Sequence, residues 1–383
     1  MVNLAKLTHL SLDNILYYRE VPSFLGDLTQ LEDLSLSNNN FDCGFPIWLT
    51  NITKHRLIVF SRNQLKGKIP SEISRLPNLS SLDLSQSSLT EAIPSVLFTI
   101  PSLYTLVLDQ NQLIVPLKFQ NIFLSPPYYL GLSENKMNEL MLGSIVNFTK
   151  LQYLRLSSIN LEGMVELNNF FKLKELQSLD LLGNKVFVSK ANINSTLPKF
   201  SSLWLSSCNL SKFPAFLEAQ NELQNLDLSN NNIEGNIPKW FWNVGKETLE
   251  YLNLSYNLLH KFEQPLVVLP WKNMYLLDLS SNMLQGSFPI PPLSTQYFLA
   301  SKNKLTGSIP PMICKVHALE VLDVSNNQLT GQISQCLLNS SNSLVVLAMK
   351  NNHFQGNMPE TFKNGCSLVT LDLNHNQIHG KIP

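Results

Sequence analysis

Two histidines and six aspartates are the side chains of this chain whose type and spacing could do catalytic chemistry. His375 and His379 lie four residues apart, a spacing that lets two imidazoles on one side of a helix hold a metal ion. They flank Asn376 in a segment with turn character, so we interpret them as surface polar residues. The aspartates belong to a repeated Leu-Asp-Leu pattern and are expected to be solvent-facing strand residues: Asp83, Asp180, Asp227, Asp278, Asp323 and Asp372.

No other pattern in the chain favours an enzyme. The GxSxG nucleophile motif, the HExxH zinc motif, a pair of CxxC motifs and the phosphate-binding P-loop are all absent, and the seven histidines are dispersed. We therefore expect no catalytic residue, no metal site and no cofactor. The function is expected to lie in a surface that binds a partner.

Twelve asparagines recur about every 24 residues. A fixed period of this length is typical of a solenoid, in which each repeat buries its apolar face against its neighbours. An asparagine side chain has two donors and one acceptor, enough to bond its own turn and the next. We expect these residues to stack as a structural ladder: Asn39, Asn63, Asn111, Asn135, Asn184, Asn231, Asn257, Asn282, Asn303, Asn327, Asn352 and Asn376.

The asparagines occupy position 9 of one frame, LxxLxLxxNxLxGxIP, which occurs sixteen times with starts 21 to 26 residues apart. Positions 4 and 6 are apolar in all sixteen repeats. Because strand side chains alternate, positions 4 and 6 point inward while positions 3, 5 and 7 point outward. The frame predicts one short strand per repeat and a parallel sheet along one side of the coil. Cys208 takes the ladder position of its repeat, where we interpret it as a buried structural substitute.

Glycine at position 13 and proline at position 16 close many repeats, as in Asn63–Pro70, which reads NQLKGKIP. This ending resembles the plant-specific class of leucine-rich repeat. The resemblance covers the whole chain and implies a β-dominated α/β solenoid of about 16 repeats of about 24 residues. It also implies a right-handed superhelix with the parallel sheet on its concave face and a second strand outside that sheet.

Residues 200–383 carry a closer resemblance. The segments LSSCNL at 205–210, IPKW at 237–240, FPIPP at 288–292, PPMIC at 310–314 and GCSL at 365–368 are similar to plant receptor-like proteins of the Cf-type disease-resistance group. That group implies a cell-surface receptor that has no kinase of its own and signals through receptor-kinase partners.

Large aromatic residues depart from the Ser, Asn and Gln background of the outward positions. Aromatic side chains are common binding anchors, because they offer a large area at low entropy cost, although strands favour tyrosine in any case. We expect the exposed sheet face around Tyr128, Tyr129, Tyr153 and Trp204 to bind the ligand. The predicted ligand-binding residues are Tyr104, Tyr128, Tyr129, Tyr153, Trp204, Tyr251, Tyr256, Tyr275 and Tyr297.

The charge balance excludes two classes of partner. The 28 basic and 28 acidic residues give a formal net charge of zero, which offers no electrostatic attraction for nucleic acid or an anionic membrane. No apolar run is long enough to span a bilayer, so we expect no direct membrane insertion. The first seven residues read as repeat sequence, without a signal-peptide pattern, and the chain ends inside a repeat. We expect one solenoid domain over residues 1–383, uncapped at both ends, from a longer receptor at the extracellular face of the plant plasma membrane.

Seven Asn-X-Ser/Thr sequons favour a glycoprotein of the secretory route. One of them, Asn253, occupies position 5 on the concave strand, where a glycan would block part of the face. The predicted glycosylation sites are Asn51, Asn78, Asn147, Asn194, Asn209, Asn253 and Asn339.

Five cysteines do not make a disulfide framework. Cys314 and Cys336 lie at positions 20 and 18 of successive repeats. Coils about 5 Å apart permit a bridge within the usual Cα separation of about 4.4–6.8 Å, and the bonded and free alternatives stay open. Cys43 and Cys366 are expected to be unpaired, unless Cys366 has a partner outside this sequence.

Two function classes fit these observations. The first is the ligand-binding part of a plant receptor-like protein that recognises an extracellular peptide, protein or glycan derived from a pathogen, with a receptor-kinase adaptor and a co-receptor as partners. The second is a soluble inhibitor of a cell-wall-degrading enzyme, similar to the polygalacturonase inhibitors, against which sixteen uncapped repeats argue. The ectodomain of a receptor kinase is a third alternative.

Overall fold

A computed structural model describes residues 4–114, 127–136, 145, 147–159, 165–187, 197–263, 268–338, 343–358 and 367–380. The chain divides into two compact units, Met1–Pro198 (unit 1) and Lys199–Pro383 (unit 2). Each unit is built from the same repeat. A single solenoid domain over residues 1–383 stays a prediction.

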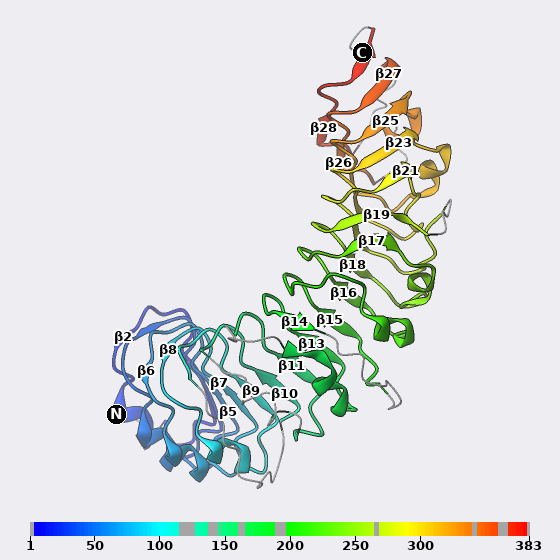
Figure 1. Cartoon of the computed structure of the whole chain (residues 1–383). Helices are drawn as coiled ribbons and strands as arrows, with labels where there is room; N and C mark the ends of the chain where they lie inside the picture. The colour runs from blue at the N-terminus through cyan, green and yellow to red at the C-terminus, as the bar shows by residue number, and fades with distance from the viewer. Residues whose placement is uncertain are drawn as a thin grey trace. The chain divides into compact units, whose positions relative to one another are not determined.

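The predicted parallel sheet is confirmed, with a three-residue strand in every repeat and eight such strands in each unit (Figure 1). Paired strands are in register, so position 4 faces position 4, as Leu10 faces Leu34. The strands of unit 1 are β1 (His9–Ser11), β3 (Asp33–Ser35), β5 (Leu57–Val59), β7 (Ser81–Asp83), β9 (Thr105–Val107), β10 (Tyr129–Gly131), β11 (Tyr153–Arg155) and β13 (Ser178–Asp180). The strands of unit 2 are β15 (Ser202–Trp204), β16 (Asn225–Asp227), β18 (Tyr251–Asn253), β20 (Leu276–Asp278), β22 (Tyr297–Leu299), β24 (Val321–Asp323), β26 (Val346–Ala348) and β28 (Thr370–Asp372).

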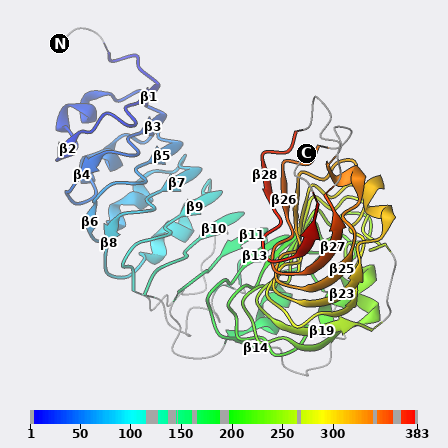
Figure 2. The same cartoon turned by 90° about the horizontal axis from the view of Figure 1, so that it is seen from above.

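A second set of short strands follows the ladder turn and pairs outside the main sheet, as the plant-type repeat implies. In Figure 2 the first four of these strands, β2, β4, β6 and β8, lie along the other edge of unit 1 from β1, β3, β5 and β7. Unit 1 has β2 (Tyr18–Arg19) with β4 (Asn40–Phe41), β6 (Lys66–Gly67) with β8 (Ser88–Leu89), and β12 (Val165–Glu166) with β14 (Val186–Phe187). Unit 2 has β17 (Glu234–Ile237) with β19 (Leu258–Phe262), and the run β21 (Gln285–Ser287), β23 (Lys304–Ser308), β25 (Gln328–Gly331), β27 (His353–Asn357) and β29 (Gln377–His379).

Short 3-10 helices return the chain to the next strand, and a proline precedes most of them. Pro70, for example, has φ −72° just before one helix; proline fixes this angle and has no N–H to leave unpaired. None of the helices in the described ranges has the length and apolar content that a bilayer crossing requires. The helices are η1 (Ser23–Asp27), η2 (Ile47–Asn51), η3 (Ser71–Arg75), η4 (Ser95–Thr99), η5 (Leu167–Lys172), η6 (Ala215–Ala219), η7 (Lys239–Asn243), η8 (Pro311–Lys315) and η9 (Gln335–Leu338).

The core runs along the inside of each unit. The position-4 and position-6 side chains, such as Leu82 and Leu84, are buried in every repeat except the first and the last, where they are half-buried. Phenylalanines at other positions complete the core, and Phe98 and Phe148 pack with ring centroids 5.1 Å apart. Because each repeat stacks only on its neighbours, this core grows with repeat number rather than with diameter.

The ladder asparagines bond the backbone of two successive turns. Asn63 donates from Nδ2 to the carbonyls of Leu36 at 2.9 Å and Phe60 at 3.0 Å, and its Oδ1 accepts from the Phe41 amide at 3.2 Å. The pattern recurs along both units, and eleven of the twelve predicted ladder residues are buried; Asn376 is half-buried. Each side chain thereby satisfies backbone groups that the turn leaves without a sheet partner.

The residue before each ladder position adopts a left-handed conformation, a feature that the sequence pattern does not reveal. Asn38 has φ 53°, Arg62 56° and Tyr256 53°, and the equivalent residue of every other repeat is also positive. Residue types as different as arginine and tyrosine occupy this position. The stacked turn, and not the residue's own preference, therefore imposes the conformation.

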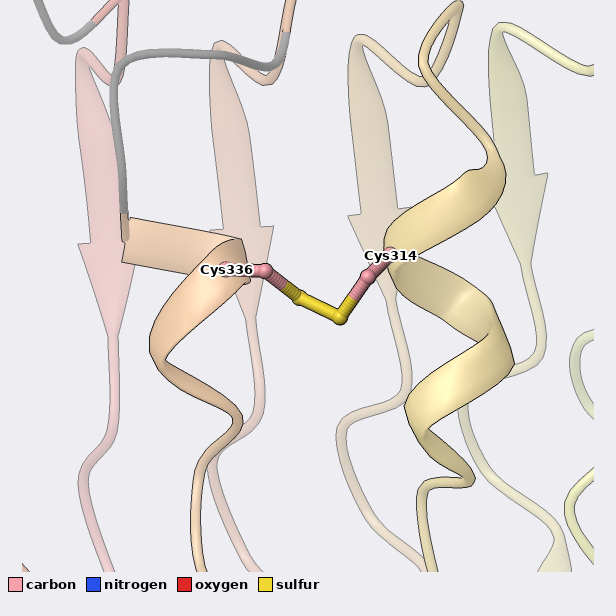
Figure 3. Close-up of a disulfide and its surroundings, with 2 residues drawn as sticks. All are labelled: Cys314 and Cys336. Atoms are coloured by element: carbon pink, nitrogen blue, oxygen red, sulfur yellow. A yellow bond between two sulfur atoms is a disulfide. The ribbon is translucent and has the colours of Figure 1, made fainter.

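One disulfide ties two successive coils of unit 2. Cys314 of η8 is bonded to Cys336 of η9, with the Cα atoms 5.8 Å apart (Figure 3). Of the two alternatives that the sequence left open, the structure has the bonded one. Cys208 is buried, with its Sγ 3.4 Å from the Ser206 carbonyl, Cys43 is half-buried without a disulfide, and Cys366 lies outside the described residues.

A buried histidine interrupts the leucine series at position 1. The side chain of His55 is fully buried, and neither ring nitrogen has a hydrogen-bond partner within the described structure. Burial lowers the pKa of His55 to about 4, against the smaller influence of the Glu32 backbone and the Asp33 carboxylate, which raise it. The imidazole is therefore neutral in the folded chain near neutral pH.

Replacing Asn231 by alanine tests the ladder. Asn231 accepts from the amides of Cys208 and Leu210 and donates to three carbonyls, so the change leaves several buried groups unpaired, at about 1–3 kcal/mol each. We expect the urea midpoint to fall strongly. The matched control is Asn232→Ala, an exposed position where the loss should stay within about 0.5 kcal/mol; equal losses would contradict the ladder. Asn230 is unsuitable as a control, because its φ is 51° and asparagine tolerates that region better than alanine.

Replacing His55 by leucine should make the stability less dependent on pH. The pKa of His55 is about 4 in the folded chain and higher in the unfolded chain, so protonation of this residue favours unfolding. The free energy of unfolding is therefore unaffected by His55 titration above about pH 6.5 and falls as the pH drops toward 4. The loss amounts to about 3 kcal/mol of unfolding free energy. Relative to the unmodified chain, the variant should therefore gain stability on going from pH 7 to about 4.5 in urea titrations. A stability difference that stays constant with pH would show that His55 does not titrate as described.

Candidate ligand-binding face

Four of the predicted aromatic residues form one row on the sheet face of unit 1. Tyr129 and Tyr153 lie on β10 and β11 and face each other in register, with ring centroids 6.1 Å apart. Tyr128 stacks on Tyr104 at 4.4 Å and contacts Tyr153 at 5.2 Å. Tyr104 is 53% exposed and the other three are half-buried. The row therefore offers ring edges and hydroxyls to solvent while the rings hold one another in place.

An arginine lies beside this row. Arg155 follows Tyr153 on β11, and its Nη1 lies 3.3 Å from Oδ2 of the buried Asp109 while its Nε lies 3.8 Å from Oδ2 of Asp180. Burial lowers the pKa of Arg155, but its hydrogen bond to Tyr129 and the charges of both aspartates raise it overall. The guanidinium is therefore a fixed positive charge in contact with the aromatic row.

A glycine makes room for this ion pair. Asp109 and Arg155 are two repeats apart, and Gly131 of β10 lies between them. A Cβ atom at Gly131 would come within 2.6 Å of the Asp109 carboxylate. That carboxylate also accepts from the Ser133 amide at 2.7 Å, and burial raises its pKa although Arg155 lowers it.

Sequence reasoning missed Asp109, Gly131 and Arg155. A signal was available, since Gly131 and Arg155 are the only glycine and the only cationic residue at position 5 in the sixteen repeats. The two departures occur in neighbouring repeats, next to the aromatic cluster.

A hollow of about 380 Å³ adjoins the row on the side where the strands begin. Tyr104 and Tyr128 form part of its wall, and Gln152 in the wall accepts from Nε2 of Gln177 at 2.8 Å. The hollow therefore combines aromatic surface with amide and charged groups; the remaining polar residues in its lining are Ser102, Lys150 and Glu175.

The five other predicted aromatic residues lie in unit 2 and do not form a single row. Trp204 packs against Tyr251 at 5.4 Å, and Tyr275 packs against Tyr297 at 5.2 Å. Tyr256 is 57% exposed and belongs to the left-handed turn position rather than to a strand. The nine predicted residues thus divide into one row of four, two pairs and a separate tyrosine.

The position-5 aspartates have a structural role that sequence reasoning did not assign. Asp227 and Asp278 each accept the amide of the serine two residues later at 2.8 Å, and Asp323 does the same at 2.9 Å. Burial raises the pKa of Asp227 and of Asp278. In the described ranges, no three His, Cys, Asp or Glu side chains gather in a group able to hold a metal ion. His375 and His379 are both exposed, and Asn357 Oδ1 lies 2.8 Å from the His379 ring.

The sequons lie mostly on exposed positions. Asn51, Asn78, Asn147 and Asn209 are exposed, while Asn194 and Asn339 lie outside the described residues. Asn253 is half-buried on β18, where its Oδ1 accepts from the Ser255 amide at 3.0 Å and its Nδ2 lies 3.4 Å from the Tyr251 hydroxyl.

Comparison with known proteins gives relatives of the same repeat class. The family model of the leucine-rich repeat matches residues 30–52, 222–244, 318–340 and 367–383. Receptor-like protein 6 of Arabidopsis thaliana is 40% identical over 241 residues, which cover 61% of this chain and 24% of that protein. The chain therefore spans about a quarter of the length of this curated relative.

Two solved structures of the Arabidopsis receptor kinase HAESA have the same fold. The HAESA ectodomain in complex with an N-terminally extended IDA peptide hormone is 26% identical with a TM-score of 0.64, and the match covers 98% of this chain and 67% of that one. The complex of HAESA with IDA and the co-receptor SERK1 is 24% identical with a TM-score of 0.63, over 99% of this chain and 63% of that one.

Replacing Arg155 by methionine tests the ion pair. The change leaves the buried Asp109 charge without its cation, and we expect a loss of about 1–2 kcal/mol of unfolding free energy at pH 7, because Arg155 is half-exposed. Below the raised pKa of Asp109 the carboxyl is neutral and needs no cation, so the loss should shrink as the pH falls to about 4. Urea midpoints at the two pH values measure this, with the exposed Lys150→Met as control. A loss equal at both values would refute the pairing.

Proposed function

We propose that the sheet face of this chain recognises an extracellular ligand. The chain belongs to the plant leucine-rich-repeat receptor-like proteins. The chain is a receptor domain and not an enzyme. The whole protein, in this proposal, lies at the plant plasma membrane with these repeats on the extracellular side, and it signals through partner receptor kinases.

The observation that carries the proposal is the tyrosine row of unit 1 with Arg155 beside it. Tyrosine and arginine are the residue types most often responsible for binding energy at protein interfaces, because each combines a large contact area with directional hydrogen bonds. Here the rings stack on one another and Arg155 is held by two carboxylates. Little side-chain entropy is therefore lost on binding, which favours affinity.

The ligand in this proposal is an extracellular peptide, protein or glycan, and of these three the relatives support the peptide. HAESA binds a peptide hormone and assembles with the co-receptor SERK1. By analogy, the ligand of this chain would bring a receptor-kinase co-receptor to the same receptor, while an adaptor receptor kinase supplies the kinase domain. The resemblance of residues 200–383 to the Cf-type group favours a ligand derived from a pathogen and a role in plant defence.

Substitution of two tyrosines tests the proposal. We expect Tyr129→Ala and Tyr153→Ala each to weaken ligand binding about tenfold or more, because a central aromatic anchor contributes about 2 kcal/mol or more. A binder is first selected from libraries of synthetic peptides and plant and microbial oligosaccharides by interferometry on the immobilised chain. The affinities of the variants for that binder are then measured.

The matched control is Tyr18→Ala, an exposed tyrosine of the same unit on the outer strand β2. Its affinity should equal that of the unmodified chain. Circular dichroism establishes that all three variants keep the fold. Normal binding by both sheet-face variants, with loss in Tyr18→Ala, would place the ligand on the outer strands and end the proposal.

A further inference from the structure

The sheet face of unit 2 carries several carboxylates without an ion pair, whereas Asp372 near its end is paired with Lys350 at 3.6 Å. Glu250 and Glu320 lie at position 2 of their repeats, and Asp227, Asp278 and Asp323 lie at position 5 of theirs. None of these five carboxylates has an ion-pair partner within 4.0 Å in the described part of unit 2. On the same face of these repeats the one cationic side chain is Lys302, at the turn position.

Unit 1 shows how a guanidinium is accommodated on such a face. There Arg155 occupies position 5, and its neighbour in register is Asp180. In unit 2 the equivalent place between two carboxylates belongs to Asn253, which lies in register with Asp227 on one side and Asp278 on the other. The arrangement differs from that of unit 1 in two ways: an acid, Asp227, takes the register place of Gly131, and Asn253 takes the place of the cation.

Aromatic rings border the same place. Tyr251 is on the strand of Asn253, two residues earlier, and Trp204 packs against it at 5.4 Å. A guanidinium is weakly hydrated, stacks on aromatic faces and bonds carboxylates through a planar fork of donors. Rings and carboxylates side by side therefore fit an arginine better than a lysine, whose ammonium is a compact point charge.

We propose that the strand face of unit 2 binds an arginine-containing segment of a peptide or protein partner, with one guanidinium over Asn253, between Asp227 and Asp278 and against Tyr251. This site lies in unit 2 and goes beyond the aromatic face of unit 1. A second arginine of the same segment fits beside the Tyr275–Tyr297 pair, where the Tyr297 hydroxyl donates to Oε2 of Glu320 at 3.1 Å.

Asn253 lies in a glycosylation sequon, and the proposed site requires that Asn253 carries no glycan. A glycan on Nδ2 would stand where the guanidinium is placed. The side chain is half-buried and its Nδ2 points to the Tyr251 hydroxyl. The chain used in the test is therefore produced in bacteria, which leave Asn253 unmodified, and mass spectrometry verifies its intact mass.

The experiment measures binding of a synthetic nonapeptide, Gly-Ser-Arg repeated three times, by calorimetry at low ionic strength. The comparison peptide replaces each arginine by citrulline, a neutral residue of the same shape. We expect the arginine peptide to bind and the citrulline peptide not to bind. Added salt should weaken binding of the arginine peptide, because the interaction is between charges. Equal binding of the two peptides, or no binding of either, would overturn the proposal.

Isosteric variants locate the site without disturbing the turn. Asp227→Asn and Asp278→Asn keep the side-chain oxygen that accepts the serine amide, as Asn253 already does, and each should weaken binding about tenfold. Asn253→Asp removes the sequon, adds a third carboxylate and should tighten binding. Unchanged affinity in all three would overturn the proposal.

Two control variants in unit 1 separate this site from the aromatic face described above. Asp83→Asn changes a carboxylate that accepts its own serine amide in the same way but lies in the other unit. Tyr129→Ala removes part of the unit 1 row. Both should bind the arginine peptide normally. If either abolishes binding, the peptide is held by unit 1 and the proposal for unit 2 is wrong, whereas the proposed role of the unit 1 face would stand.

Discussion

The stacked asparagine amide is the interaction on which the rest of the structure depends. Every repeat turns sharply after its strand, and a sharp turn beside a core leaves backbone amides and carbonyls unpaired unless a side chain meets them. Asn231 accepts hydrogen bonds from two amides of the preceding repeat and donates to three carbonyls. Without such a group each turn would cost several buried hydrogen bonds, and strands three residues long would have no fixed register.

The fixed register is what makes the outward positions a usable surface. Because position 5 of one repeat lies beside position 5 of the next, a side chain is placed about 4.8 Å from its counterpart without any contact of its own. The unit 1 row uses this spacing for stacked tyrosines, and Arg155 and Asp180 use it for an ion pair. Unit 2 uses it for a series of acids, each closing its own turn. The same backbone thus presents two chemically different faces.

Most of the fold could be predicted from the sequence, because the same residue types recur at the same positions of a repeat of about 24 residues. The strands, the ladder and the inward leucines all follow from a frame that is repeated sixteen times. The left-handed residue before the ladder could not be predicted, since residues such as Arg62, Glu134 and Tyr256 adopt the conformation without an intrinsic preference for it. In the sequence His55 was visible only as a residue that replaces leucine at position 1. Its burial and the lack of hydrogen-bond partners for its ring nitrogens could be known only from the packing of the structure.

The candidate site was predicted in part. The tyrosines of unit 1 were expected on one face, and they lie in contact. The Asp109–Arg155 pair spans two repeats across Gly131. The unusual residue types of Gly131 and Arg155 were visible in the frame, but the frame does not show that the partner of Arg155 lies two repeats away. The aromatics of unit 2 were expected on the same face, but they form two separate pairs, Trp204 with Tyr251 and Tyr275 with Tyr297.

Hydrogen–deuterium exchange tests most directly whether side-chain amides hold the turns. The amides of Leu113, Ile233 and Leu284 are bonded to the Oδ1 atoms of Asn135, Asn257 and Asn303, at 3.1, 3.0 and 2.9 Å. We expect these three amides to exchange as slowly as amides of the main sheet, because the bonds are buried and break only when the coil opens. Exchange at the rate of exposed turn amides, in a chain whose sheet amides are protected, would contradict the account.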